Sequence, residues 1–258
     1  MSQARFTERL RLAHADAWEA ATRHPMTDAI AAGTVPEDVY KQYLVQDHKF
    51  LDAFSVLLSS AVSHARKLED RIPGAQFLAV ILGPENTYFE RSFSALGVSA
   101  SERATAPTAT TSRFISLMRM AAASGELAEM LAVLVVAEWV YLTWGERAAS
   151  SRAADLPFWF GEWIDLHAGT NFEGVVAYLR ELLDAEAEHM DAAAQQRTER
   201  TFGLALRLEI DFWDQAWHGE SDAAKQAFEG YERASLEHEA ARLESRAGAL
   251  KEQLARLN

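Results

Sequence analysis

The sequence predicts an all-α fold, and three observations lead to that prediction. Apolar residues recur three or four positions apart, and no convincing stretch alternates apolar and polar residues as a β-strand does. All six prolines lie at or before position 157, so long stretches contain no helix breaker. Glycines fall where the apolar pattern pauses, which is typical of helix ends. These are Gly33, Gly97, Gly125 and Gly169.

The apolar pattern predicts a succession of helices with short connections. We expect them at 3–23, 36–66, 73–83, 85–96, 111–123, 126–150, 157–168, 171–197, 199–219 and 222–256. The segment 97–107 is the clearest loop, and no repeat or linker interrupts the pattern before about residue 220. We therefore predict a helical domain over 1–220 and a separate C-terminal amphipathic helix over 221–258.

Composition excludes several classes of protein. Acidic residues outnumber basic ones by 38 to 25, and a surface with a net charge of -13 repels phosphate backbones and anionic lipids. We expect no nucleic-acid partner and no membrane partner. The chain has no cysteine, which excludes disulfides, thiolate metal sites and cysteine nucleophiles. Its first residues lack the apolar segment of a secretory signal, and no stretch approaches the ~20 apolar residues of a membrane span, so we expect a cytoplasmic location.

An acidic residue interrupts an aromatic helix face near position 47. Asp47 shares this predicted face with Tyr43, Phe50 and Phe54. A buried carboxylate needs a hydrogen-bond partner or a raised pKa. Asp47 therefore either serves a pocket or bonds structurally to a neighbouring helix, and the sequence leaves both interpretations open.

Two later helices repeat this feature. Glu138 follows the wholly apolar run 130–137 and lies one turn before Tyr141, although it could also mark the solvent-facing end of the buried part. Glu209 shares a face with Phe212 and Trp213. On the same helix, Arg207 and Asp211 are expected to point elsewhere.

Three acids on apolar or aromatic faces together predict one polar pocket with aromatic walls. Such a pocket suits a flat, nitrogen-rich ring. Carboxyl groups in these surroundings have raised pKa values and can act as acid or base near neutral pH.

Metal ligation is the competing use of these acids. Di-iron helical bundles carry two Glu-x-x-His motifs, one on each of two helices, and this chain does not have such a pair of motifs. The nearest approach is Glu186 with Glu188 and His189, whereas the stretch 181–188 is expected to be a solvated helix face. We therefore predict no metal site and no cofactor.

The last forty residues carry a heptad-like seam. Leucine or alanine recurs at alternating spacings of four and three, flanked by Glu, Arg and Lys. The seam comprises Leu236, Ala240, Leu243, Ala247, Leu250, Leu254 and Leu257. It is expected to be buried either against a second subunit or in a groove of its own domain.

An ordered set of motifs over residues 10–217 resembles the TenA/thiaminase-II family. The matching segments are His24-Pro25-Met26, Ala32–Pro36, Tyr43 with Gln46-Asp47, Ser124-Gly125 with Ala128-Glu129, and Glu209 with Phe212-Trp213. The resemblance implies a heme-oxygenase-like helical bundle, assembled as a homodimer or homotetramer, that binds pyrimidine fragments of thiamin.

The resemblance also implies roles for individual residues. The family's nucleophilic cysteine corresponds to Ala137, so the chain resembles the cysteine-less branch, in which a Glu such as Glu138 stands next to that position. Asp47 corresponds to the ring-binding Asp and Glu209 to the catalytic Glu. The aromatic walls correspond to Phe50, Phe114 and Tyr141, and His167 replaces a pocket tyrosine.

These observations predict a thiamin-salvage hydrolase acting on an amino- or formylamino-methylpyrimidine. Glu138 and Glu209 are the expected catalytic acid and base; the substrate-binding residues would be Asp47, Tyr43, Phe50, Phe114, Tyr141, His167 and Trp213. The alternatives are a metal-dependent oxygenase, a PQQ-synthesis-type oxidase, or a non-enzymatic binding or regulatory protein on the same bundle.

Overall fold

The computed structural model describes residues 4–219 and 222–257, and every regular element in these ranges is helical. The all-α prediction is therefore confirmed. The elements, in chain order, are α1 (Phe6–Ala13), α2 (Ala15–Thr22), α3 (Pro25–Ala32), α4 (Glu37–His48), α5 (Phe50–His64), α6 (Leu68–Val80), the π-helical turn η1 (Ile81–Glu85), α7 (Asn86–Ala95), α8 (Ala100–Arg103), α9 (Ala109–Ser124), α10 (Leu127–Ser151), α11 (Phe158–Leu166), α12 (Thr170–Ala187), α13 (Ala192–Trp217) and α14 (Lys225–Leu257).

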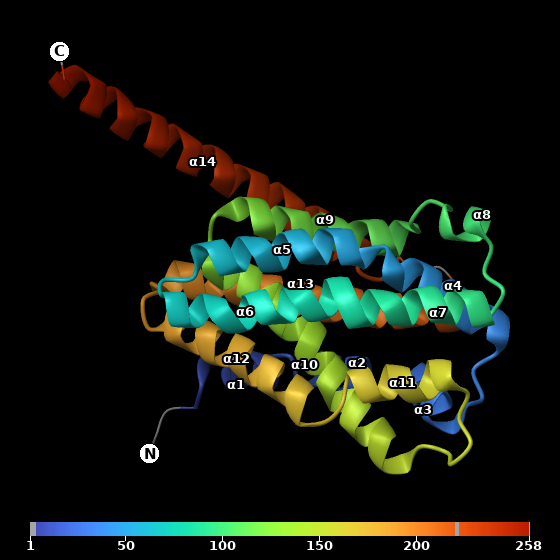
Figure 1. Cartoon of the computed structure of the whole chain (residues 1–258). Coiled ribbons are helices and arrows are strands. Elements are labelled where there is room, and N and C mark those ends of the chain that lie inside the picture. Colours follow the sequence, from blue (N-terminus) through green and yellow to red (C-terminus); the bar gives the residue numbers. More distant parts are fainter. Residues whose placement is uncertain (1–3, 220–221, 258) are drawn as a thin grey trace.

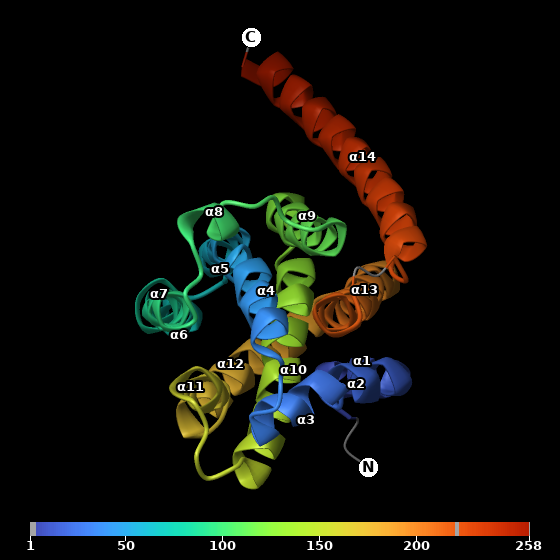
Figure 2. The ribbon, with the colours of Figure 1, turned by 90° about the vertical axis from the view of Figure 1, so that its right-hand side faces the viewer.

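Helix α10 is the axis around which the other helices pack. It contacts α5, α9, α12 and α13, and Figure 2 shows it running through the middle of the bundle. Its residues Met130 to Val136 are fully buried, which explains why this stretch is apolar on every side. Among the described residues, α10 is also the one helix long and apolar enough to span a membrane, but its most apolar part is almost entirely buried by its neighbours.

Several predicted helices are divided in the structure. The segment expected as 3–23 breaks at His14, and the segment expected as 36–66 breaks at Lys49. Helix α3 was not predicted: Pro25 occupies its first turn, and the His24 Nδ1 atom accepts a hydrogen bond from the Met26 backbone N–H at 3.2 Å. A histidine cap of this kind has no strong sequence signature.

The prolines of the 73–96 region do not divide it where the sequence predicts. Helix α6 begins at Leu68 and continues through Pro73, and Pro84 lies inside the π-helical turn η1. Proline cannot donate to a carbonyl in the preceding turn, and the wider π turn accommodates that missing hydrogen bond within one continuous helical stretch.

Helix α14 leaves the bundle and projects outward, as Figure 1 shows. Its first turns pack on the body through the buried residues Ala224 and Phe228, and it contacts α9 and α13. The leucines of the seam are exposed, so the expectation that a groove of their own domain covers them is wrong. Leu257 has a side chain outside the described set.

One further expectation about exposure is also wrong. Glu186, expected on a solvated face, is buried and accepts hydrogen bonds from Arg66 at 2.6 and 3.0 Å. Asp211, expected to point elsewhere than the aromatic face of Glu209, is buried too and accepts a hydrogen bond from the Ala224 backbone N–H at 2.8 Å. In both cases the partner comes from another element, which periodicity along one helix cannot reveal.

Candidate active site

The acids predicted on three separate helices line a single cavity of about 70 Å³ inside the bundle. Asp47 comes from α4, Glu138 from α10 and Glu209 from α13. The three helices are arranged so that the acidic side chain of each one faces the same cavity. The other predicted residues that line this cavity are Phe50, Phe114, Tyr141 and His167.

Tyr43 and Trp213 lie directly behind this lining. The Trp213 ring stacks on Tyr43 at a centroid distance of 5.4 Å and on Tyr141 at 5.6 Å. Both Tyr43 and Trp213 are fully buried. They support the wall of the cavity, whereas the sequence analysis had placed them among the residues that bind substrate.

A directed chain of hydrogen bonds ends on Asp47. The indole N–H of Trp163 can only donate, and it lies 3.1 Å from the Tyr43 hydroxyl. The hydroxyls of Tyr43 and Tyr141 are 3.0 Å apart, and the Tyr141 hydroxyl donates to Asp47 Oδ1 over 3.5 Å. The last contact is long, so Asp47 keeps acceptor capacity for a ligand.

Burial raises the pKa of every acid in the cavity. It raises the pKa of Asp47 to about 8, against the opposing effect of the Tyr141 hydrogen bond. Burial also raises the pKa values of Glu138 and Glu209 well above their usual range, and the neighbouring carboxyl groups add to the effect. Carboxyl groups that share one cavity cannot all be negatively charged at once. The cluster therefore holds shared protons near neutral pH.

The Glu209 carboxyl group is not fully hydrogen-bonded within the described part of the chain. Its Oε2 atom is buried and has no hydrogen-bond partner among the described residues. Glu138 is only 8% exposed, so the interpretation that it turns to solvent is wrong. Among residues 4–219 and 222–257, no lysine or arginine lines the cavity, so none of their cations neutralises either group there.

Glu85 is a cavity residue that the sequence analysis missed. It is the last residue of η1, lines the cavity and has a pKa raised to about 8 by burial, with Asp47 adding to the shift. Tyr88 and Phe89 follow it at helical spacing, but the sequence analysis placed Glu85 at the start of the predicted helix 85–96. The available signal was Pro84, since a proline within a helical stretch favours a π turn, and such turns are frequent at functional sites.

His167 is held as a neutral imidazole. Its Nδ1 atom lies 2.8 Å from the Trp163 carbonyl oxygen, which requires a proton on Nδ1, and burial lowers its pKa to about 4. The Nε2 atom is then a hydrogen-bond acceptor. Gly145 permits this placement, because a Cβ at position 145 would lie 2.3 Å from the His167 carbonyl oxygen.

Ala137 also lines the cavity, next to Glu138. Its methyl group supplies no nucleophile at the position that resembles the family's cysteine. A cavity of about 150 Å³ binds benzene. A space of 70 Å³ is about half of that volume, so a pyrimidine ring enters only by displacing side chains at its edge.

One group of possible metal ligands lies outside the cavity. His24, Asp214 and His218 place ligand atoms within 4.8 Å of one another. However, His24 Nδ1 accepts a backbone hydrogen bond, so the proton of the neutral ring is on Nε2, the atom that faces Asp214 at 3.2 Å. A protonated Nε2 cannot ligate a metal ion, and we interpret the group as a structural hydrogen bond that fixes the start of α3.

Comparison with known proteins agrees with this architecture. Residues 12–219 match the model of the TENA/THI-4/PQQC family. The aminopyrimidine aminohydrolase of Halalkalibacterium halodurans is 29% identical over 203 residues, covering 78% of this chain and 90% of that protein. The aminopyrimidine aminohydrolase of Bacillus subtilis is 28% identical, covering 85% of this chain and 94% of that protein.

Solved structures carry the same fold. A TenA homologue from P. horikoshii superimposes with a TM-score of 0.74 at 21% identity, covering 84% of this chain and 100% of that chain. The heme-oxygenase-like helical bundle expected from the resemblance is thereby confirmed. Helix α14 lies beyond the segment that matches the family model.

Proposed function

The chain belongs to the TENA/THI-4/PQQC family, and from that premise we propose that it hydrolyses a C–N bond of a thiamin-derived pyrimidine. The names of the two aminohydrolases support the reaction class. The cavity supports it independently, since its aromatic walls match a flat ring and its acids match the polar edge of an aminopyrimidine.

We assign substrate recognition to Asp47 and the surrounding rings. The ring nitrogen and exocyclic amine of an aminopyrimidine form an amidine-like edge, which pairs with a carboxyl group through two parallel hydrogen bonds. Tyr141 orients Asp47 by donating to Oδ1. Phe50 and Phe114, whose ring centroids are 5.3 Å apart, form part of the apolar wall beside it.

We assign the proton transfers to Glu138 and Glu209. With Ala137 at the nucleophile's position, water itself must attack. For a formylamino substrate, the water oxygen attacks the formyl carbon while one carboxylate accepts the proton that water loses. The C–N bond then breaks, the second carboxyl group protonates the leaving amine, and formate and the aminomethylpyrimidine are released. One group gains a proton and the other loses one, so the pair needs one internal proton exchange to reset.

The observation that carries the proposal is the unpartnered Oε2 atom of Glu209, buried in a cavity lined by further acids and by no cation. The test is to incubate the purified chain with formylaminopyrimidine, aminopyrimidine and thiamin, and to measure formate and ammonia. Formate or ammonia release by the native chain, lost in Glu209→Gln, supports the proposal. No release from any of the three substrates would overturn it.

We further propose that the substrate is the small-molecule partner, and that the chain works in the cytoplasm as a homodimer or homotetramer, as the resemblance implies. We also propose that residues 1–220 form the complete catalytic unit and that 221–258 form an appended helix. The family match ending at residue 219 supports this division.

A further inference from the structure

The two sides of α14 differ in what they meet. Beyond Phe228, the side chains that are partly buried all lie on the side facing the body: Tyr231, Ser235, His238, Glu239 and Arg242. The seam lies on an adjoining side of the helix, where Leu236 is 63%, Leu243 52%, Leu250 56% and Leu254 62% exposed. From residue 243 to residue 256 every side chain is exposed.

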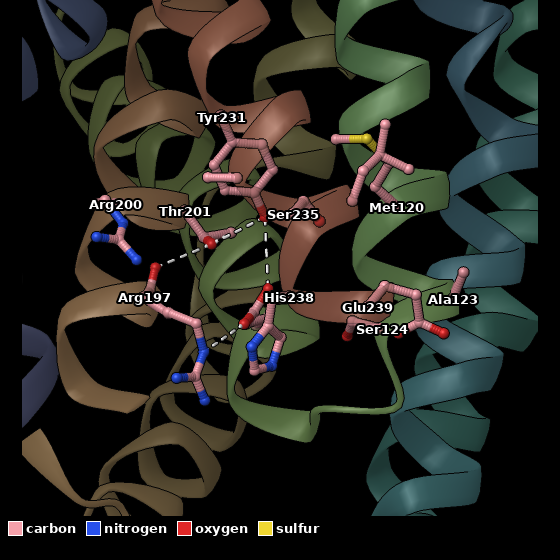
Figure 3. A pocket seen from close by; sticks show the side chains of 13 residues that line it. Met120, Ala123, Ser124, Arg197, Arg200, Thr201, Tyr231, Ser235, His238 and Glu239 are labelled. Atoms are coloured by element: carbon pink, nitrogen blue, oxygen red, sulfur yellow. Dashed lines mark hydrogen bonds and ion pairs between the residues drawn. The ribbon is translucent and has the colours of Figure 1, made fainter. Parts of the chain in front are cut away.

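The root of α14 is fixed in this orientation. The hydroxyl of Tyr231 lies 3.0 Å from that of Thr201 on α13, and it donates to Glu129 on α10 over 3.5 Å. Figure 3 shows Tyr231 and His238 turned toward Thr201 and Arg197. The hollow between α14 and the body has a volume of about 140 Å³, and Leu236 is among the residues that line it. Turning the later leucines inward would break these contacts, so the domain leaves the seam from Leu243 onward uncovered.

We propose that the seam of α14 pairs antiparallel with the same seam of a second copy of this chain. In one register Leu236 lies opposite Leu254 of the second copy, Ala240 opposite Leu250, and Leu243 opposite Ala247. This register is symmetric about a two-fold axis near Ser245, so every contact occurs twice, as an isologous interface requires.

Packing favours this arrangement over a parallel one. The seam has leucine at one heptad position throughout, and Ala240, Ala247 and Leu254 at the other. A parallel pair would face alanine with alanine at two layers and leave voids there. The antiparallel pair places each alanine against a leucine, so large and small side chains alternate across the interface.

Charges beside the seam point in the same direction. In the antiparallel register, Glu237 lies beside Lys251 of the second copy at both ends of the pair, whereas Glu244 and Arg246 each lie beside their own equivalent once, near the axis. In a parallel pair, Glu239 would face Glu244 of the second copy, and Arg246 would face Lys251. Flanking charges of this kind set the orientation of coiled-coil partners.

The absence of cysteine from the chain permits a direct test of orientation. Leu236→Cys and Leu254→Cys are made separately in the full-length chain, each at an exposed position. In the antiparallel register, residue 236 lies opposite residue 254 and about 27 Å along the helix from its own copy, since α-helices rise 1.5 Å per residue. The two variants, mixed under reducing conditions and then oxidised, should form a disulfide dimer, whereas each variant alone should not. Rapid cross-linking of each variant alone would indicate parallel pairing and overturn the proposal.

A second test measures the assembly. Replacing Leu243 and Leu250 with Lys places charges in the seam and should halve the mass measured by light scattering. The matched control replaces Ser245 and Ala249 with Lys on the outer side of the same helix and should leave the mass unchanged. An unchanged mass in the Leu243→Lys, Leu250→Lys variant, together with no cross-linking in the mixed cysteine sample, would show that α14 does not pair. Neither readout depends on catalysis, so these results are separable from those of the proposed function.

Discussion

The acid-lined cavity and the far half of α14 present opposite forms of incompleteness. In the cavity, polar groups are buried inside one chain and lack charged partners, as the unpaired Oε2 atom of Glu209 illustrates. On α14, apolar groups are exposed and lack cover, as Leu236 and Leu254 illustrate. An unsatisfied buried acid is complemented by a small polar ligand, whereas an uncovered leucine seam is complemented by another apolar surface. The same chain therefore carries two unsatisfied regions that call for different chemistry.

The largest expected effect is on catalysis in the cavity. Glu209→Gln keeps the shape of the side chain but cannot transfer a proton, so kcat/KM should fall about 100-fold or more, and Glu138→Gln should act likewise. The matched control is Glu146→Gln, which alters an exposed position later on α10 and should leave the rate unchanged. Steady-state kinetics on the substrate that the native chain turns over measures this. Equal rates in the three variants would mean that other groups transfer the protons.

The pH profile should reflect the shared protons of the cavity. Burial raises the pKa of Asp47 and of Glu85 to about 8, so the cluster gains negative charge only as the pH rises through that value. If the catalytic base belongs to this cluster, kcat/KM should rise about tenfold per pH unit below pH 8 and fall again at higher pH, once the second carboxyl group has lost the proton that it gives to the leaving amine. A profile that is flat from pH 5 to pH 9 would separate the reaction from these acids.

Replacing Glu85 should have a smaller effect, limited to the position of the pH–rate profile. Its charge raises the pKa of Glu138, so Glu85→Gln should move the rising limb of the pH–rate profile to lower pH. We expect a displacement of less than about one pH unit, because burial is the larger cause of the shift. A decrease in the limiting rate without any displacement would instead give Glu85 a direct part in the reaction.

The sequence predicted a residue's place correctly when the signal lay within that residue's own helix. It failed when the place depended on a distant part of the chain. Asp47, Glu138 and Glu209 could be found because each interrupts an apolar face of its own helix. Glu85 was missed although Tyr88 and Phe89 follow it at helical spacing, because the sequence predicts a helix that begins at residue 85. The π turn that ends at Glu85 also departs from the period of 3.6 residues per turn.

The same reason explains the errors of exposure and of helix boundaries. Glu186 is buried by Arg66 from a distant part of the chain, and that pairing leaves no mark in the local pattern. The seam of α14 was recognised from its spacing, but only the three-dimensional position of Tyr231 and Arg242 shows that it faces away from the body. Periodicity thus identifies a face, whereas tertiary structure determines what the face meets.

Stability should respond to the buried acids in the direction opposite to activity. A carboxyl group whose folded pKa is raised is neutral in the native state and ionised in the unfolded state at neutral pH. The unfolded state then binds fewer protons, so the free energy of unfolding should fall as the pH rises from about 4 to 8 and change little above that.

Removing one such acid should therefore stabilise the fold. Glu209→Gln is expected to raise Tm at pH 7.5 by about 2–4 °C, the effect of about 1 kcal/mol in a chain of this size. The increase should shrink at pH 4.5, where the unfolded chain is also largely protonated. Calorimetry at the two pH values tests this, and a lower Tm for the variant at both would show that the Glu209 carboxyl group stabilises the native state.

The smallest expected effect on the active site comes from the tail. Truncation after Arg242 removes residues 243–256, whose side chains are exposed in the single chain, together with the last two residues, and it keeps Phe228 and Tyr231, which pack on the body. Truncation at residue 221 would remove those contacts as well, so it is not a clean test of the projecting half. The shortened chain should retain kcat/KM within about twofold and should show a Tm change of a few degrees at most, since exposed positions contribute little to stability. Kinetics and calorimetry on this variant, measured beside light scattering, test the separation between the two regions. A large loss of kcat/KM with an unchanged assembly would place part of α14 over the cavity, and the two regions would then form one site.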